Sequence, residues 1–230
     1  MKYIKMFESF LNDNFKKWFG DSKVVDDKGN PMVMYHGSPH IDDIKEFKNT
    51  KGYNFFTSSE NEASRYTGGV AGSYYGDVHK VGKFYIKALN PFDPTKMSES
   101  ELESISKLFK DNPNIIKTIS EDMVHEVIEN FDWYWDNDYN SKLKPIEILY
   151  EKGYSDSDIL IVLITKSLDN YILLENETVQ EWIISNGYDS FITLESGGGD
   201  FNIAVYNANQ IKSVNNNGNY SDSSNVFESK

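Results

Sequence analysis

Residues 35 to 40, YHGSPH, place a histidine, a glycine and two hydroxyl groups at the end of an extended stretch, MVMYHGS. Imidazole and hydroxyl groups can hold a polar ligand through hydrogen bonds. Two further pieces could join them, the aromatic segment FFTSSENEASRY at 55–66 and the late apolar stretch FNIAVY at 201–206. Each piece alone is also typical of an ordinary core, so the interpretation depends on their combination.

Sequence patterns around these pieces predict the elements that position them. Turn-forming residues at 27–31 separate two strands, NFFTS is a short strand, and Ser59 with Glu62 is spaced as the capping box of a helix of about two turns. KVGKFYIKALNPFDP, YDSFITL and FNIAVY predict three more strands. Residues 1–19 have apolar residues at helical spacing, so we expect an N-terminal helical leader.

The middle of the chain, residues 98–187, changes to helical patterns and opens with a second capping box, Ser98 with Glu101. Further helices are predicted at 145–152, 157–168 and 177–185. Strands at both ends with helices between them predict one α+β domain over residues 20–214, carrying a helical insertion at 98–187. The polar segment 215–230 is expected to be disordered.

Composition excludes several classes of protein. The 230 residues suit one sizeable domain, and the absence of cysteine excludes disulfides and thiolate metal sites and fits a reducing, cytoplasmic setting. No apolar stretch approaches the ~18 residues of a membrane-spanning helix. The four histidines show no metal-ligand spacing, so no metal is predicted.

The net charge of −13 is concentrated in the middle of the chain. Residues 1–97 contain 14 basic and 12 acidic residues, a net charge of +2, whereas residues 98–187 contain 7 and 19, a net charge of −12. An anionic ligand of the first hundred residues therefore meets little repulsion. The acidic middle favours a basic protein or a basic patch as a partner.

Together, the three pieces resemble the ADP-ribosyltransferases of the diphtheria toxin and poly(ADP-ribose) polymerase type, the histidine–tyrosine–glutamate class. The likeness is closest to the small transferase domains of phage polyvalent proteins and covers roughly residues 15–97 and 182–225. It implies a split antiparallel β-sandwich with an NAD cleft. It also implies transfer of ADP-ribose from NAD to a macromolecule, with release of nicotinamide.

The resemblance assigns roles to the first two motifs. His36 would hold the NAD ribose, while Gly37 and Ser38 would hold the nicotinamide amide. Phe55 and Tyr66, eleven residues apart, would sandwich the nicotinamide ring. Because that ring is cationic in NAD, an aromatic slot gains about 0.5 to 2 kcal/mol from stacking and cation–π attraction.

Three neighbours are predicted to complete NAD binding. Tyr35 and Phe56 adjoin the two motifs, and Arg65, the one arginine of the chain, could contact the NAD pyrophosphate through its fork of donors. The alternative for Arg65 is a solvated side chain, since it points to a different face of the helix from Tyr66.

The third motif departs from the family pattern, because Asn202 occupies the position of the catalytic glutamate. A neutral amide can bond a ribose hydroxyl but cannot stabilise a cationic transition state. Three alternatives follow: Asp200 or Glu195 supplies the carboxylate, Asn202 serves with an acceptor that is already nucleophilic, or the protein binds NAD-like ligands without turnover. Asp200 and Asn202 share one face of a strand.

The sequence thus predicts an NAD-dependent mono-ADP-ribosyltransferase, with His36, Tyr66 and Asp200 or Asn202 at the reacting sugar. The resemblance implies a phage or mobile-element effector that modifies a host macromolecule, a protein in preference to nucleic acid, in the bacterial cytoplasm. The leader MKYIKMFESFL resembles those of phage head proteins, which favours carriage in the virion. The alternatives are a catalytically degenerate module that binds a nucleotide or a protein, and an RNA 2′-phosphotransferase, which a single arginine disfavours.

Overall fold

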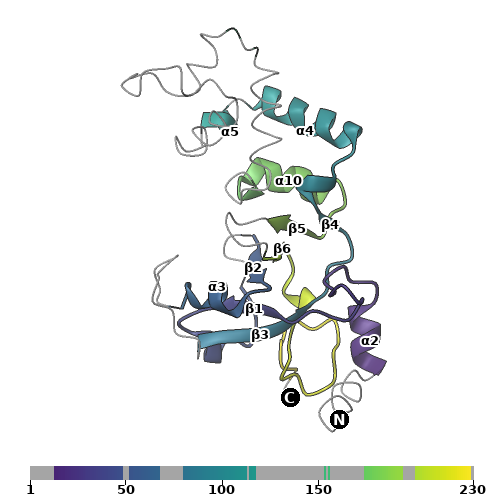
Figure 1. Cartoon of the computed structure of the whole chain (residues 1–230), viewed down its shortest axis with the longest axis vertical. Coiled ribbons are helices and arrows are strands. Elements are labelled where there is room, and N and C mark those ends of the chain that lie inside the picture. The colour runs from purple at the N-terminus through teal and green to yellow at the C-terminus, as the bar shows by residue number, and fades with distance from the viewer. Residues whose placement is uncertain are drawn as a thin grey trace. The chain divides into compact units, whose positions relative to one another are not determined.

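The computed structural model of the chain describes residues 13–48, 52–67, 80–112, 114–117, 153, 155, 174–193 and 200–228 (Figure 1). The chain divides into two compact units. The first contains residues 1–92, 187–192 and 198–230, and the second contains residues 93–186 and 193–197. The candidate residues at 35–38, 55–66 and 200–202 all belong to the first unit.

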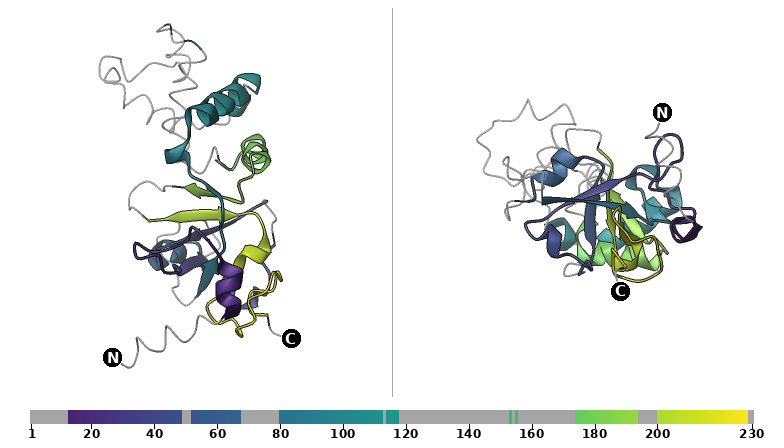
Figure 2. Two further views of the ribbon diagram at one scale, coloured as in Figure 1. Left: turned by 90° about the vertical axis from the view of Figure 1, so that its right-hand side faces the viewer. Right: turned by 90° about the horizontal axis from the view of Figure 1, so that it is seen from below.

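The first unit is built on a seven-stranded sheet of order β4-β5-β6-β2-β1-β3-β7 (Figures 1 and 2). The strands are β1 Met34–Gly37, β2 Asn54–Thr57, β3 Val81–Ile86, β4 Pro91–Phe92, β5 Ser190–Thr193, β6 Asn202–Val205 and β7 Ile211–Ser213. The β1–β2, β1–β3, β2–β6 and β3–β7 pairs are antiparallel, whereas β4 and β5 are parallel. The predicted α+β class is confirmed. The parallel pair departs from an all-antiparallel arrangement, and the split into two layers stays a prediction.

Alternate residues of the central strands fill the core of the first unit. Met34 of β1, Phe56 of β2 and Ile203 of β6 have exposed fractions of 2% or less and belong to one apolar cluster. Successive side chains of a strand point to opposite faces of the sheet. Phe55 and Asn202 therefore lie on the face opposite this cluster.

Helix α2, Asp13–Phe19, is the described part of the predicted N-terminal helix. Phe15 and Trp18 are buried, and their rings contact Tyr220. Trp18 also donates its indole N–H to the backbone carbonyl of Asn209 at 3.1 Å. Helix α2 is therefore part of the first unit, because its apolar face needs a partner to bury it, and a leader over residues 1–19 stays a prediction.

The second unit contributes α4 Glu99–Asp111, α5 Asn114–Lys117, α10 Glu177–Ser185 and the 3-10 helix η3 Pro94–Lys96. The capping box before α4 is confirmed, since Ser98 accepts from the Glu101 N–H while the Glu101 carboxylate accepts from the Ser98 N–H. The predicted helices at 145–152 and 157–168 lie outside the described residues, so a helical insertion at 98–187 stays a prediction. Within the described ranges, no helix is long and apolar enough to cross a membrane.

The C-terminal segment, residues 214–228, is folded against the first unit, so the prediction of disorder there is wrong. Val226 is fully buried in the core cluster, and its carbonyl accepts the N–H of Ser213 in β7 at 3.0 Å. Its own N–H donates to the Lys45 carbonyl at 2.9 Å. The segment covers the outer edge of β7, where a bare strand would expose unpaired backbone groups.

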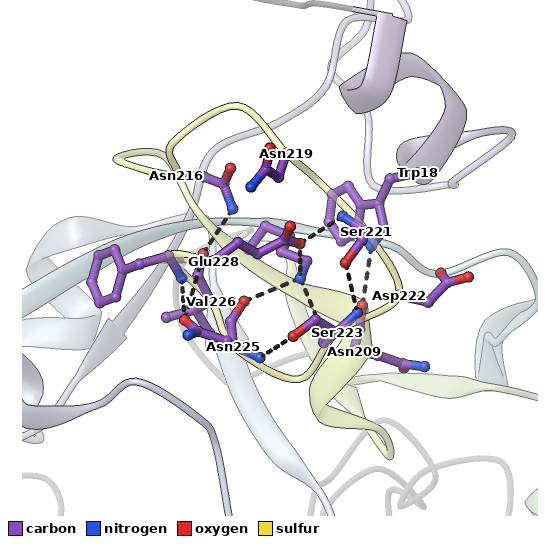
Figure 3. Close-up of polar contacts among 12 residues, drawn as sticks. Trp18, Asn209, Asn216, Asn219, Ser221, Asp222, Ser223, Asn225, Val226 and Glu228 are labelled. Atoms are coloured by element: carbon purple, nitrogen blue, oxygen red, sulfur yellow. Dashed lines mark hydrogen bonds and ion pairs between the residues drawn. The ribbon is translucent and has the colours of Figure 1, made fainter. Parts of the chain in front are cut away.

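A buried lysine explains why so polar a segment is ordered, and its partners Ser223, Asn225 and Glu228 are labelled in Figure 3. The Lys212 ammonium donates to the carbonyls of Ser223 at 2.7 Å and Asn225 at 3.1 Å, and it forms an ion pair with Glu228. Asparagine and serine side chains of the segment accept nearby backbone N–H groups, as they do in tight turns. The segment thus packs through hydrogen bonds around a buried cation, which its polar composition does not reveal.

Candidate active site

His36 lies in β1, and its ring is held by a backbone carbonyl. Nδ1 of His36 is 2.8 Å from the carbonyl oxygen of Phe55 in β2. A carbonyl only accepts, so Nδ1 carries the proton and Nε2 of the neutral ring is an acceptor. Burial lowers the pKa of His36, with the Phe55 carbonyl opposing this effect. The result is a neutral imidazole that can accept a hydrogen bond from a ligand hydroxyl.

Gly37 lets helix α3, Glu60–Ser64, lie directly on β1. A Cβ atom at this position would be 1.8 Å from the backbone oxygen of Ala63 and 3.3 Å from the Thr67 side chain. No side chain fits in that space, so the glycine is required by the close approach of the helix. The Ser59 hydroxyl caps α3 by accepting the N–H of Glu62 at 3.2 Å, which is one half of the predicted capping box.

Tyr35 and Ser38 flank His36 and Gly37, and both are partly exposed. The Ser38 hydroxyl accepts the N–H of His40 at 3.2 Å, in the turn that leads to the 3-10 helix η1, Ile41–Asp43. The Tyr35 ring has the Lys83 ammonium 5.4 Å from its centroid, within the range of a cation–π contact. Both side chains remain accessible at the end of β1.

The two phenylalanines of β2 have different environments. Phe56 is 2% exposed and packs its ring against His36 and Phe84 in the core. It therefore supports His36 and does not present a ring to a ligand, which corrects its assignment to NAD binding. Phe55 lies on the opposite face and is partly exposed, in contact with the rings of Tyr53 and Phe191.

Arg65 and Tyr66 follow the last turn of α3. Tyr66 is 39% exposed, and its N–H donates to the Ala63 carbonyl at 3.2 Å. The Arg65 guanidinium nitrogen Nη1 is 2.9 Å from both carboxylate oxygens of Glu62. The predicted pyrophosphate contact of Arg65 would have to compete with this ion pair.

Asn202 begins β6 directly beside Thr57 of β2. Its side chain is 4% exposed, and within the described residues its buried Nδ2 has no hydrogen-bond partner. Ser58 fixes the preceding residue through two bonds to Phe201, one from its N–H to the carbonyl at 2.8 Å and one from the Phe201 N–H to its hydroxyl at 2.9 Å. Asp200 is partly exposed two residues before Asn202, and Glu195 lies outside the described residues.

The structure places the three motifs on adjacent strands, since β2 lies between β1 and β6. Phe55 joins them, because its carbonyl holds His36 while its ring lies on the face of Asn202. Strand alternation puts the His36 ring on the other face, against Phe56. The sequence predicted that these residues meet, but it did not predict that the central strand separates them by face.

A family model described as ADP-ribosyltransferase in polyvalent proteins matches residues 26–220. The chain belongs to this ADP-ribosyltransferase family. No curated protein and no solved structure matches the chain.

The match to the ADP-ribosyltransferase family includes all three motifs and ends within the C-terminal segment, at residue 220. Domains of this family transfer ADP-ribose and use NAD as their substrate. Among the residues that the structure describes in this ADP-ribosyltransferase domain, no group of three or more His, Asp or Glu side chains could hold a metal ion.

Sequence reasoning missed several residues that contribute to the candidate site of this ADP-ribosyltransferase-family domain. Tyr53 could have been found, because it stands two residues before Phe55 and so shares its face in a strand. Ser58 and Phe191 could not, because their contacts depend on which strands pair and in which register. Sequence patterns predict strands but not their partners.

Proposed function

We propose that this domain transfers single ADP-ribose units from NAD to a host macromolecule, a protein in preference to nucleic acid. The observation that carries the proposal is the neutral His36, whose Nδ1 is bonded to the Phe55 carbonyl. That bond leaves Nε2 as an acceptor suited to a ribose hydroxyl. Since the rings of His36 and Phe55 lie on opposite faces of the sheet, the proposal requires NAD to reach both faces at the end of β1. Phe55 and Tyr66, both accessible, offer rings suited to the cationic nicotinamide.

In the proposed reaction, the bond between C1′ of the ribose and the nicotinamide nitrogen breaks, and a bond from C1′ to the acceptor forms. Nicotinamide leaves as a neutral molecule, and positive charge builds on the sugar in the transition state. Asp200 is the proposed carboxylate that stabilises this charge and takes the acceptor's proton, because it is partly exposed near Asn202. Asn202 is proposed to hold a ribose oxygen through its Nδ2, which has no hydrogen-bond partner among the described residues.

The resemblance to phage polyvalent proteins supports an effector role in the bacterial cytoplasm, with delivery in the virion. The acidity of residues 98–187 supports a basic protein as partner. A split β-sandwich around the NAD site belongs to the same proposal.

A second candidate is a nucleotide-binding module without turnover, which the amide at position 202 favours. Because Asn202 lacks the charge of a carboxylate, it can position a ribose but cannot stabilise a developing cation. This candidate predicts NAD binding without nicotinamide release.

The test incubates the purified protein with NAD labelled in the adenosine part and with bacterial lysate, followed by protease or nuclease. Label is expected in a protease-sensitive product and is expected to be lost in His36→Gln and Asp200→Ala. His40→Ala is the matched control, because His40 is exposed in the same segment and should retain activity. Label that His36→Gln leaves unchanged would contradict the proposal, and activity gained only by Asn202→Glu would favour the binding module.

A further inference from the structure

The rings around Phe55 extend the proposed site beyond its motifs. Phe55 contacts Tyr53, with ring centroids 5.1 Å apart and planes at 72°, and Phe191, at 5.7 Å and 87°. Tyr53 and Phe191 also contact each other at 5.6 Å, so the three rings form a closed triangle. Both contacts of Phe55 are near-perpendicular, so neither partner stacks flat on its ring.

Phe191 is the most deeply buried of the three rings. It is fully buried in β5, and its ring also contacts Tyr206 at 5.8 Å. Phe55 is partly exposed. A ring in a close-packed interior keeps one orientation, so Phe191 can fix the ring that it touches.

The strand that carries Phe191 is anchored directly before it. The Asp189 carboxylate accepts the N–H of Leu89 at 2.7 Å and of Asn90 at 3.2 Å. The Gln210 side chain donates to the Asp189 carbonyl at 3.1 Å. The chain leaves the first unit after Phe92 and returns to it at Gly187, and the bonds of Asp189 to Leu89 and Asn90 join these two stretches. The start of β5 is therefore held in place.

We infer that Phe191 is a positioning residue that sets the orientation of the Phe55 ring for the nicotinamide of NAD, with Tyr53 as a second support. The inference rests on the proposed function. Edge-to-face contacts orient a ring, and a ring that is ordered before binding loses less entropy when a ligand stacks on it. Loss of Phe191 therefore weakens binding of the nicotinamide and spares binding of the ADP-ribose part.

The test compares two ligands that differ in the nicotinamide. A carbocyclic NAD analogue, whose nicotinamide bond resists cleavage, and ADP-ribose are titrated by calorimetry into the full chain. Phe191→Leu is expected to bind the NAD analogue about three- to tenfold more weakly than the unmodified protein. Its affinity for ADP-ribose is expected to change by less than about twofold. A general folding defect would instead lower the affinities for both ligands.

Phe92→Leu is the matched control. Phe92 faces Phe191 in the β4–β5 register and is 1% exposed, but its ring packs on Tyr188 at 5.2 Å. This variant should lose a similar amount of stability and keep the ratio of the two affinities. Where Phe191→Leu does not fold, Phe191→Met gives the same comparison, because it keeps the volume and loses the rigid ring.

The outcomes separate the inference from the proposed function. The inference is overturned, while the proposed function stands, if Phe191→Leu lowers the affinities for both ligands equally or leaves the affinity for the NAD analogue unchanged. If the unmodified protein binds neither ligand, the proposed function fails and the inference fails with it.

Discussion

The buried lysine of β7 under the C-terminal segment and the buried asparagine at the start of β6 differ in whether their polar groups have partners. Lys212 is fully buried and has two carbonyls and one carboxylate as partners. Asn202 is almost as buried, yet within the described residues its Nδ2 has no partner. An unsatisfied buried donor costs about 1–3 kcal/mol. The difference indicates that the first region stabilises the fold, while the second gives up stability where a ligand could supply the missing bond.

Breaking the buried ion pair should have the largest effect. Lys212→Met removes the cation and leaves the Glu228 carboxylate buried without its counter-charge. We expect the free energy of unfolding to fall by about 3–5 kcal/mol, measured by urea denaturation. The double variant Lys212→Met with Glu228→Gln should recover part of this loss. A decrease below about 1 kcal/mol would show that the ion pair does not hold the segment.

Gly37→Ala should lower the free energy of unfolding by about 1–3 kcal/mol. The added methyl group would meet the Ala63 carbonyl, so α3 must move away from β1 and carry Tyr66 with it. Binding of the NAD analogue should weaken as well, measured by calorimetry. Gly29→Ala is the control, because it is strained by a positive φ of 79° but has open space around it. It should lose stability and keep its affinity, and equal affinity losses in both variants would argue against a role for α3.

Asn202→Leu tests the unsatisfied donor directly. Within the described residues the buried Nδ2 of Asn202 has no partner, so an apolar side chain of similar size should raise the free energy of unfolding by up to about 1–3 kcal/mol. Transfer of label from NAD should be lost in the same variant. A stability loss in thermal denaturation would mean that the native amide has a partner, and the contrast with Lys212 would then disappear.

The smallest expected effect is a pH dependence from His36. Burial lowers its pKa below the usual 6.5, so at acid pH the unfolded chain binds a proton that the folded chain resists. The stability due to the neutral ring is therefore fully present above pH 6.5 and is lost progressively as the pH falls further. The difference in unfolding free energy between the unmodified protein and His36→Gln should be smaller at pH 5.5 than at pH 7.5. An unchanged difference would mean that the ring is not desolvated.

Local patterns predicted the elements well because they depend on neighbouring residues. The capping box at Ser98 and the bounds of the helix at 177–185 follow from spacing within one or two turns. The packing of the C-terminal segment could not be predicted in this way, because Lys212 is buried only through partners that the fold brings together. From composition alone, a lysine is expected to lie on the surface with its charge in water.

The same limit applies to the candidate site. The motif residues and the β2 strand that links them could be read from the sequence. The separation of His36 and Asn202 by sheet face, the core position of Phe56 and the support from Phe191 all depend on register. Register is set by pairing between distant segments, which periodicity within one strand cannot reveal.

The pairing of β2 with β6 also fixes when the site can form. Ser58 and Phe201 form two hydrogen bonds at one end of the β2–β6 pair and are separated by 143 positions in the chain. Contacts between such distant residues form slowly, because closing the long loop between them costs entropy. On a ribosome, the N-terminal strands therefore emerge long before their partner strand exists. A nascent chain therefore cannot place the three motifs on adjacent strands until β6 has been synthesised.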